Sequence, residues 1–147
     1  MQKIKFIIPV IIISFLSGIA LFYISDWKNP EDIIRIEVQT GEYLFRSYSD
    51  YTIDFKNNTL TYINSNRVTR FNDEDKKYFV NKANIYGMFH WKEKYIPRGD
   101  VYDGSYTNID IIYNDGSCYT IYCHIKRPLT YDKMREVFIE SFGYYII

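Results

Sequence analysis

The side chains of this 147-residue chain that are best suited to chemistry are its two histidines and a pair of aspartates. An imidazole beside a carboxylate can transfer protons or bind a metal ion, so such a site needs His90 or His124 to meet Asp100 or Asp103. The two aspartates could also hold a cation through their oxygen atoms. No HxH, HExxH or EF-hand spacing is present, so we expect no catalytic residue, no metal and no cofactor.

Nucleophile and phosphate motifs are missing as well. The chain has no GxSxG turn for a catalytic serine and no GxGxxG or Walker-type loop for phosphates. Cys118 and Cys123 lie in one predicted strand, where an odd spacing points their side chains to opposite faces. Their Cα atoms are then about 16 Å apart, beyond the ~7 Å that a disulfide allows. We expect two separate thiols.

A ligand-binding surface, if there is one, is predicted from aromatic side chains. The chain contains 16 Tyr, 10 Phe and 2 Trp. The coding bias of an AT-rich genome explains this abundance, but phenol rings also stack well on sugars or on a partner protein. The candidate contact residues are Tyr106, Tyr122 and His124 on the predicted sheet, with Asp100 and Asp103 in the preceding loop.

The charge balance excludes some partners. Lys plus Arg number 18 and so do Asp plus Glu, and three of each sign precede Ile33. The part of the chain after the linker is therefore neutral too. Because nucleic-acid binding normally requires a basic excess, we expect no nucleic-acid partner and no polybasic lipid-binding surface.

The first 25 residues predict a transmembrane signal anchor. Residues 6–24 carry no charge, and about 20 residues span a ~30 Å hydrocarbon core. Phe22, Tyr23 and Trp27 follow at the far end, as interfacial aromatic residues do. The alternative is a signal peptide cleaved after Ala20. The apolar run continues beyond that position, which favours retention of the segment in the membrane.

The flanking charges predict the orientation of this anchor. Lys3 and Lys5 precede the span, and acidic residues dominate the linker, residues 26–32. Positive charge stays on the cytoplasmic side, so the N-terminus is expected inside the cell. Residues 33–147 are then expected outside it as one domain, because their length suits a single modest core.

Alternating hydrophobic residues predict strands in the first half of this domain. A strand begins at Ile33, a turn is expected at Thr40 and Gly41, and a second strand covers residues 43–55. A two-residue loop at Asn57 and Asn58 then pairs Phe55 with Leu60 and Ile53 with Tyr62. A further strand covers residues 67–71. Asn72 and the acidic residues that follow it, 73–75, predict the start of a helix that runs to about Phe89.

The second half predicts an irregular loop, a hairpin and a final helix. Residues 92–103 carry turn signals. In the hairpin that follows, Ile109, Ile111, Tyr119 and Ile121 share one face only if the loop between the two strands has three residues. This loop, residues 114–116, puts Gly116 in a left-handed conformation. It pairs Ile111 with Tyr119 and Ile109 with Ile121, and it brings His124 opposite Tyr106. Thr130 is expected to cap a helix over residues 131–142.

This order of elements predicts an α+β fold. We expect an antiparallel sheet of hairpins with about two helices packed on one face.

The C-terminal third resembles a family of uncharacterised exported domains of Gram-positive bacteria, which are membrane-anchored or lipid-anchored. The similarity lies in Asp103 and Gly104, the strand at residues 109–113, the second Asp-Gly turn at Asp115, and Pro128 followed by Tyr131. The resemblance implies a location at the cell surface and an α+β fold, and it implies no activity.

Three functions follow as hypotheses. The leading one is a non-enzymatic, single-pass protein whose outer domain binds an envelope protein, a peptide or a wall polymer, in an accessory or immunity-type role. The second is a minor cell-envelope hydrolase that uses residues 92–103. The third is a structural subunit of a membrane complex that pairs through its membrane helix.

Overall fold

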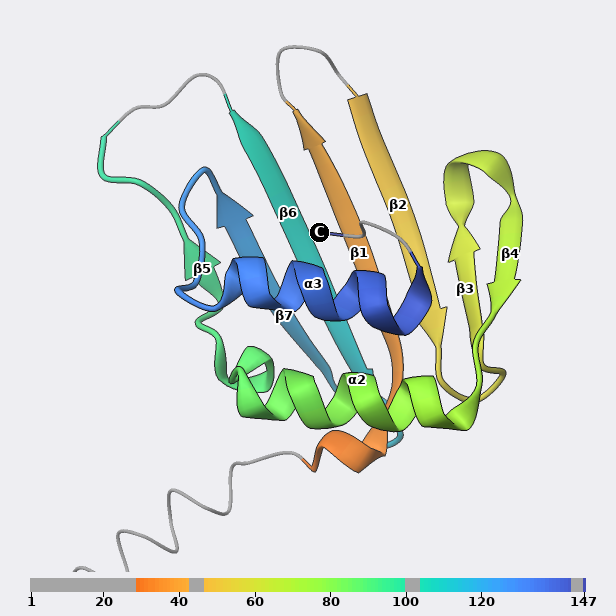
Figure 1. Cartoon of the computed structure of the whole chain (residues 1–147). Helices are drawn as coiled ribbons and strands as arrows, with labels where there is room; N and C mark the ends of the chain where they lie inside the picture. The colour runs from red at the N-terminus through yellow and green to blue at the C-terminus, as the bar shows by residue number, and fades with distance from the viewer. Residues whose placement is uncertain (1–28, 43–46, 100–103, 144–146) are drawn as a thin grey trace, which may run out of the picture.

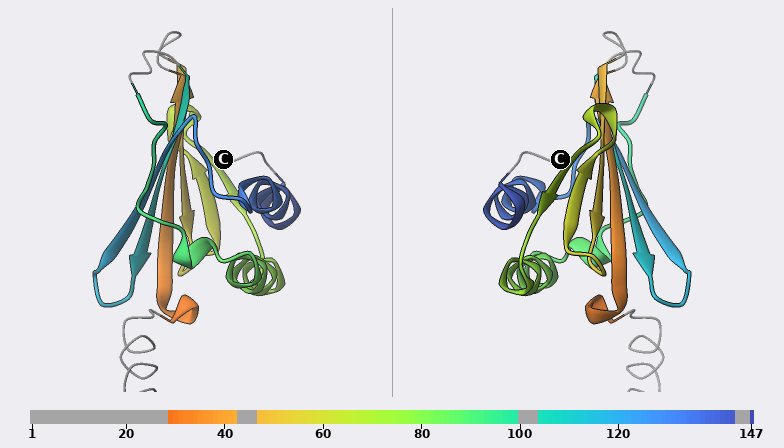
Figure 2. Two further views of the ribbon diagram at one scale, coloured as in Figure 1. Left: turned by 90° about the vertical axis from the view of Figure 1, so that its left-hand side faces the viewer. Right: turned by 90° about the vertical axis from the view of Figure 1, so that its right-hand side faces the viewer.

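The computed structural model describes residues 29–42, 47–99, 104–143 and 147. It has an α+β fold, in which a seven-stranded mixed sheet carries two helices on one face (Figures 1 and 2). The expected membrane span and the two loop aspartates lie outside the described residues. Within the described ranges, no helix has the length and apolar character needed to cross a membrane.

The sheet order is β4-β3-β2-β1-β6-β7-β5, and β5 alone pairs in parallel, with β7. The expectation of a purely antiparallel sheet is therefore wrong at this edge. The strands are β1 (Ile33–Glu42), β2 (Ser47–Asp54), β3 (Thr59–Tyr62), β4 (Arg67–Arg70), β5 (Lys94–Tyr95), β6 (Ser105–Tyr113) and β7 (Cys118–His124). The helices are α2 (Asp73–Ile85) and α3 (Tyr131–Phe142), with the short 3-10 helices η1 (Pro30–Asp32), η2 (Ile63–Ser65) and η3 (Met88–His90).

The core lies between the sheet and the two helices. Apolar side chains from the inner face of the sheet and from both helices are buried there, and their aromatic rings contact one another in tilted or edge-to-face arrangements at centroid distances of 5.0 to 6.2 Å. Burying each such side chain contributes about 1.5–3 kcal/mol. The central members are Ile36, Ile53, Ile109, Ile111, Ile121, Phe79, Met134 and Phe138.

The β6–β7 hairpin has the register that the sequence predicts. Ile111 pairs with Tyr119, Ile109 pairs with Ile121, and Gly116 has φ +82°. Only a three-residue loop brings the two apolar sets onto one face, so the register was determined by residue parity. The prediction is confirmed for this half of the sheet.

The predicted register of the β2–β3 hairpin is wrong by two residues. Ile53 pairs with Leu60 and Asp54 pairs with Thr59, so the loop has four residues instead of two. The side chain of Asp54 explains the longer loop, because its Oδ1 accepts hydrogen bonds from the backbone N–H of Lys56 and Asn57 at 2.8 and 3.0 Å. Such a turn competes with the tight type I′ turn. A shift of two residues keeps the apolar side chains on the correct face.

Two element boundaries also differ from the prediction. Thr40 and Gly41 form no turn, because β1 continues to Glu42 and pairs with both β2 and β6. Helix α2 ends at Ile85 rather than near Phe89, because Gly87 takes up a left-handed conformation with φ +69° just beyond it. A glycine in this position commonly ends a helix.

We predict that one of the two thiols reacts in the folded protein. Cys118 is exposed, whereas Cys123 is buried on the other face, and burial raises the pKa of the Cys123 thiol to about 11 despite the nearby charge of Arg127. Because the thiolate is the reactive form, an aromatic disulfide reagent at pH 8 should modify Cys118 quickly and Cys123 only after unfolding.

The Cys118→Ser variant is the control, and it should show no fast reaction. Fast modification of two thiols in the native protein would contradict the register of β7.

Candidate functional site

The sheet face opposite the helices holds three of the sequence-predicted candidates together. Tyr106 lies directly across from His124, as expected, and Tyr122 lies across from Asn108 on the same face. All are half-buried. The predicted loop partners Asp100 and Asp103 lie outside the described residues.

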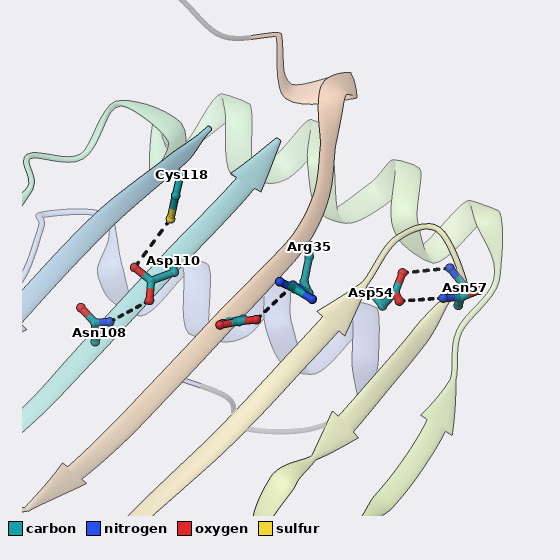
Figure 3. A network of polar contacts seen from close by, with 7 residues as sticks. Arg35, Asp54, Asn57, Asn108, Asp110 and Cys118 are labelled. Atoms are coloured by element: carbon teal, nitrogen blue, oxygen red, sulfur yellow. Dashed lines mark hydrogen bonds and ion pairs between the residues drawn. The ribbon is translucent and has the colours of Figure 1, made fainter. Parts of the chain in front are cut away.

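This open face carries a polar network (Figure 3). Asp110 accepts hydrogen bonds from Asn108 Nδ2 at 3.1 Å and from Thr120 Oγ1 at 2.5 Å, and Arg35 forms an ion pair with Glu37 at 3.0 Å. No group of three or more His, Cys, Asp or Glu side chains that could hold a metal occurs in the described part of the chain.

A pocket that the sequence reasoning missed lies at the β5 edge of the sheet. Figure 1 shows β5, the loop from β7 to α3, and the chain that follows α2 gathered at this side. They line an open surface pocket of about 520 Å³, which we call the edge pocket. It is lined by Tyr86, Trp91, Lys92, Lys94, Tyr95, Ile96, Lys126, Arg127, Pro128, Leu129 and Thr130.

Hydrogen bonds through Thr130 fix the inner wall of the edge pocket. Trp91 Nε1 donates to Thr130 Oγ1 at 3.0 Å, and this hydroxyl donates in turn to the carbonyl oxygen of Tyr86 at 2.7 Å. Thr130 occupies the N-cap position of α3, as expected, but its side chain makes no capping hydrogen bond. Its hydroxyl instead joins the start of α3 to the chain that follows α2.

A tight turn at Ile125 positions the next residues of the edge-pocket wall. Ile125 has φ +60°, and Lys126 N donates to His124 O at 2.5 Å, which is the strained form of a γ-turn. Gly104 makes room for this turn, because a Cβ at that position would lie 2.4 Å from Ile125 Cγ1. The turn directs Lys126 and Arg127 to the edge pocket.

The edge pocket is positively charged. Its lining residues include four cations and no acidic residue. Lys92, Lys94 and Lys126 have no carboxylate at ion-pair distance within the described ranges. The guanidinium of Arg127 is held 4.6 Å above the ring of Tyr131 and donates to Ser105 Oγ at 3.2 Å. The N-terminal end of α3 adds its positive dipole, so the pocket suits an anion.

A second cavity, of about 480 Å³, lies where the linker meets α2. Its lining combines Glu31 with Lys76 and Lys77 and with asparagine side chains. The mixed charge indicates no particular class of ligand, so the edge pocket is the stronger candidate.

Sequence reasoning missed the edge pocket because its residues come from two distant segments, residues 86–96 and 126–130. A zero net charge also hides a local cluster of cations. The available signal was the pairing of two short basic runs with neighbouring aromatic residues, at Lys92 and Lys94 and at Lys126 and Arg127.

We predict that the Thr130 hydroxyl stabilises the pocket wall. In Thr130→Val the Trp91 N–H and the Tyr86 carbonyl both lose their partner, which should lower the free energy of unfolding by about 1–3 kcal/mol. Urea unfolding of the full chain in non-ionic micelles measures this, with Trp91 fluorescence in a Trp27→Phe background.

Thr130→Ser keeps the hydroxyl and should cost less than about 1 kcal/mol. No loss of stability in Thr130→Val, together with a clear loss in Thr130→Ser, would show that packing of the methyl group matters and that the hydrogen bonds do not.

Comparison of the chain with protein-family models, with curated proteins and with solved structures gave no match. The resemblance of the C-terminal third to exported domains therefore stays a prediction, and the functional argument depends on the geometry of the site.

Proposed function

We propose that this is a single-pass membrane protein whose outer domain binds an anionic partner at the cell envelope, in an accessory or immunity-type role. Residues 6–24 anchor it, the N-terminus lies in the cytoplasm, and residues 33–147 lie outside. The observation that carries the binding role is the edge pocket, in which four cations and three aromatic residues meet without a carboxylate.

The charge pattern of the pocket supports binding of an anion. Lysines that form no ion pair within the described ranges keep their charge available to a ligand. An anion that enters the pocket meets several cations at once, and a cluster attracts it more strongly than single surface charges do.

The position of the pocket also supports this role. The linker of residues 26–32 spans at most about 25 Å, so the domain stays close to the membrane. Figure 1 shows the described end of the linker beneath α2, whereas β5 and the start of α3 lie at the side of the sheet. The segments that line the edge pocket therefore lie apart from the described end of the linker.

Binding fits the described residues better than catalysis. Of the titratable groups that line the edge pocket, none is a carboxylate, a histidine or a cysteine. General acid–base catalysis at neutral pH ordinarily uses such groups. A binding role needs only charge and shape.

We predict that the domain is exposed on the outside of intact cells. Protease applied to whole cells should degrade residues 33–147 and leave an N-terminal fragment in the membrane fraction, because the folded part is outside the lipid. A cytoplasmic protein followed in the same cells is the control. A native chain that begins at Leu21, or a domain that survives the protease, would contradict the anchoring.

We predict that the purified full chain in non-ionic micelles binds a fluorescent hexaglutamate peptide and does not bind hexalysine. Lys92→Gln and Lys126→Gln should each weaken this binding several-fold, and salt should weaken it as well, because exposed charges are screened over ~10 Å at 0.1 M. Fluorescence anisotropy at several salt concentrations measures the affinity.

The matched control is Lys56→Gln, which removes an exposed lysine in the β2–β3 loop. Equal binding of both peptides, or equal effects of all three variants, would remove the edge pocket as the anion site.

A further inference from the structure

We infer that the ligand of the edge pocket is an acidic segment of a protein chain that places an aliphatic or aromatic side chain in the pocket between its carboxylates. This inference rests on the proposed function and names the class of its partner. Four features of the pocket carry it.

The first feature is an apolar rim. The side chain of Leu129 is fully exposed, with a relative exposure of 105%, and Ile96 is 48% exposed. Both line the edge pocket. A single exposed apolar residue is ordinary. Two at the mouth of one pocket form an apolar surface whose burial by a ligand would lower the free energy of the complex. A ligand that uses this rim must itself carry an apolar group.

The second feature is the aromatic floor. The Trp91 ring is 4% exposed and stacks on Tyr131 at a centroid distance of 6.0 Å. Its N–H is already bonded to Thr130, and the Tyr95 hydroxyl accepts from the backbone N–H of Lys92 at 2.9 Å. Trp91 is thus covered by its neighbours, and the ring surface that a ligand can reach on this floor belongs to the half-buried Tyr86 and Tyr95. An apolar side chain fits such a floor better than the hydroxyl groups of a sugar or polyol, which need hydrogen-bond partners.

The third feature is that the cations of the pocket come from two separate segments of the chain. Lys92 and Lys94 come from the β5 segment, whereas Lys126 and Arg127 come from the loop before α3. Carboxylates on either side of a central apolar residue would complement both groups at once. This charge complementarity favours an acidic chain with an apolar anchor in its middle.

The fourth feature is an open backbone edge. β5 is the last strand of the sheet, and Tyr122 N donates to Glu93 O at 2.8 Å, so the backbone of residue 93 faces β7. Because strands alternate, the N–H and C=O of Lys94 face away from β7. An extended peptide can add hydrogen bonds to such an edge, which a phosphate polymer without amide groups cannot do in the same way.

The test uses the full chain in non-ionic micelles and four fluorescent ligands measured by anisotropy. The first peptide has a leucine between two runs of three glutamates, and the second has glycine in place of that leucine. The third has lysines in place of the glutamates, and the fourth ligand is a glycerol-phosphate oligomer of matched charge. The leucine peptide should bind about tenfold or more tightly than the glycine peptide, because the anchor is buried.

Variants separate the apolar contribution from the charge. Leu129→Ser should lower the affinity for the leucine peptide several-fold and leave the affinity for the glycine peptide unchanged. Ile63→Ser is the matched control, because Ile63 is 51% exposed in η2, outside the edge pocket. It should change neither affinity.

The outcomes distinguish the two proposals. If the glycine peptide or the glycerol-phosphate oligomer binds as tightly as the leucine peptide, the protein-segment inference is overturned while an anion-binding function stands. If Leu129→Ser has no effect on the leucine peptide, the inference falls as well. If no anionic ligand binds, or the lysine peptide binds best, the proposed function itself is lost.

Discussion

The alternation of side chains along β6 and β7 determines where the other groups of the domain lie. Alternate residues of β6 from Thr107 to Tyr113, and Ile121 and Cys123 of β7, are buried. They lie on the sheet face that α2 and α3 cover (Figure 2). A slip of one residue would turn Ile109 and Ile111 to solvent and cost about 1.5–3 kcal/mol for each. With the register fixed in this way, Tyr106, Tyr122 and His124 have to lie on the open face.

The same register determines where the chain leaves the sheet for α3. A buried hydrogen bond of 2.8 Å between Thr107 and the Tyr131 hydroxyl holds the start of α3 against β6. Burial raises the pKa of Tyr131, so this hydroxyl stays protonated at neutral pH and available for the bond. Trp91 and Thr130 then join the helix start to the chain after α2. The edge pocket is thus built on well-ordered contacts, and a pre-formed site loses less free energy when it binds.

The sequence predicts the elements that local patterns determine. The β6–β7 hairpin and the limits of α3 follow from residue parity, an Asn-Asp-Gly turn and an apolar stripe. The predicted β2–β3 register was wrong because two registers that differ by two residues keep the same side chains on the buried face. The hydrogen bonds of the Asp54 side chain select between them. The two-residue strand β5 could not be predicted, since it forms only because β7 is beside it.

The edge pocket was beyond sequence reasoning for a similar reason. Its two halves are separated by about thirty residues of chain, and they are joined by the parallel pairing of β5 with β7 and by the hydrogen bonds of Thr130 to Trp91 and Tyr86. A neutral composition gave no hint of a basic cluster. The positions of Tyr106, Tyr122 and His124 on the open face were predicted correctly, because cross-strand pairing follows from the hairpin register.

The central claim is that this domain meets its partner at the edge pocket and outside the membrane. The most direct measurement replaces Leu129 by a photo-reactive benzophenone amino acid in intact cells, with the same replacement of the exposed Val68 in β4 as the reference. The account predicts a cross-linked product with an envelope protein from position 129 that disappears when Lys126 and Arg127 are changed to Gln, and none from position 68. Cross-linking from position 68 alone, or to cytoplasmic proteins, would contradict it.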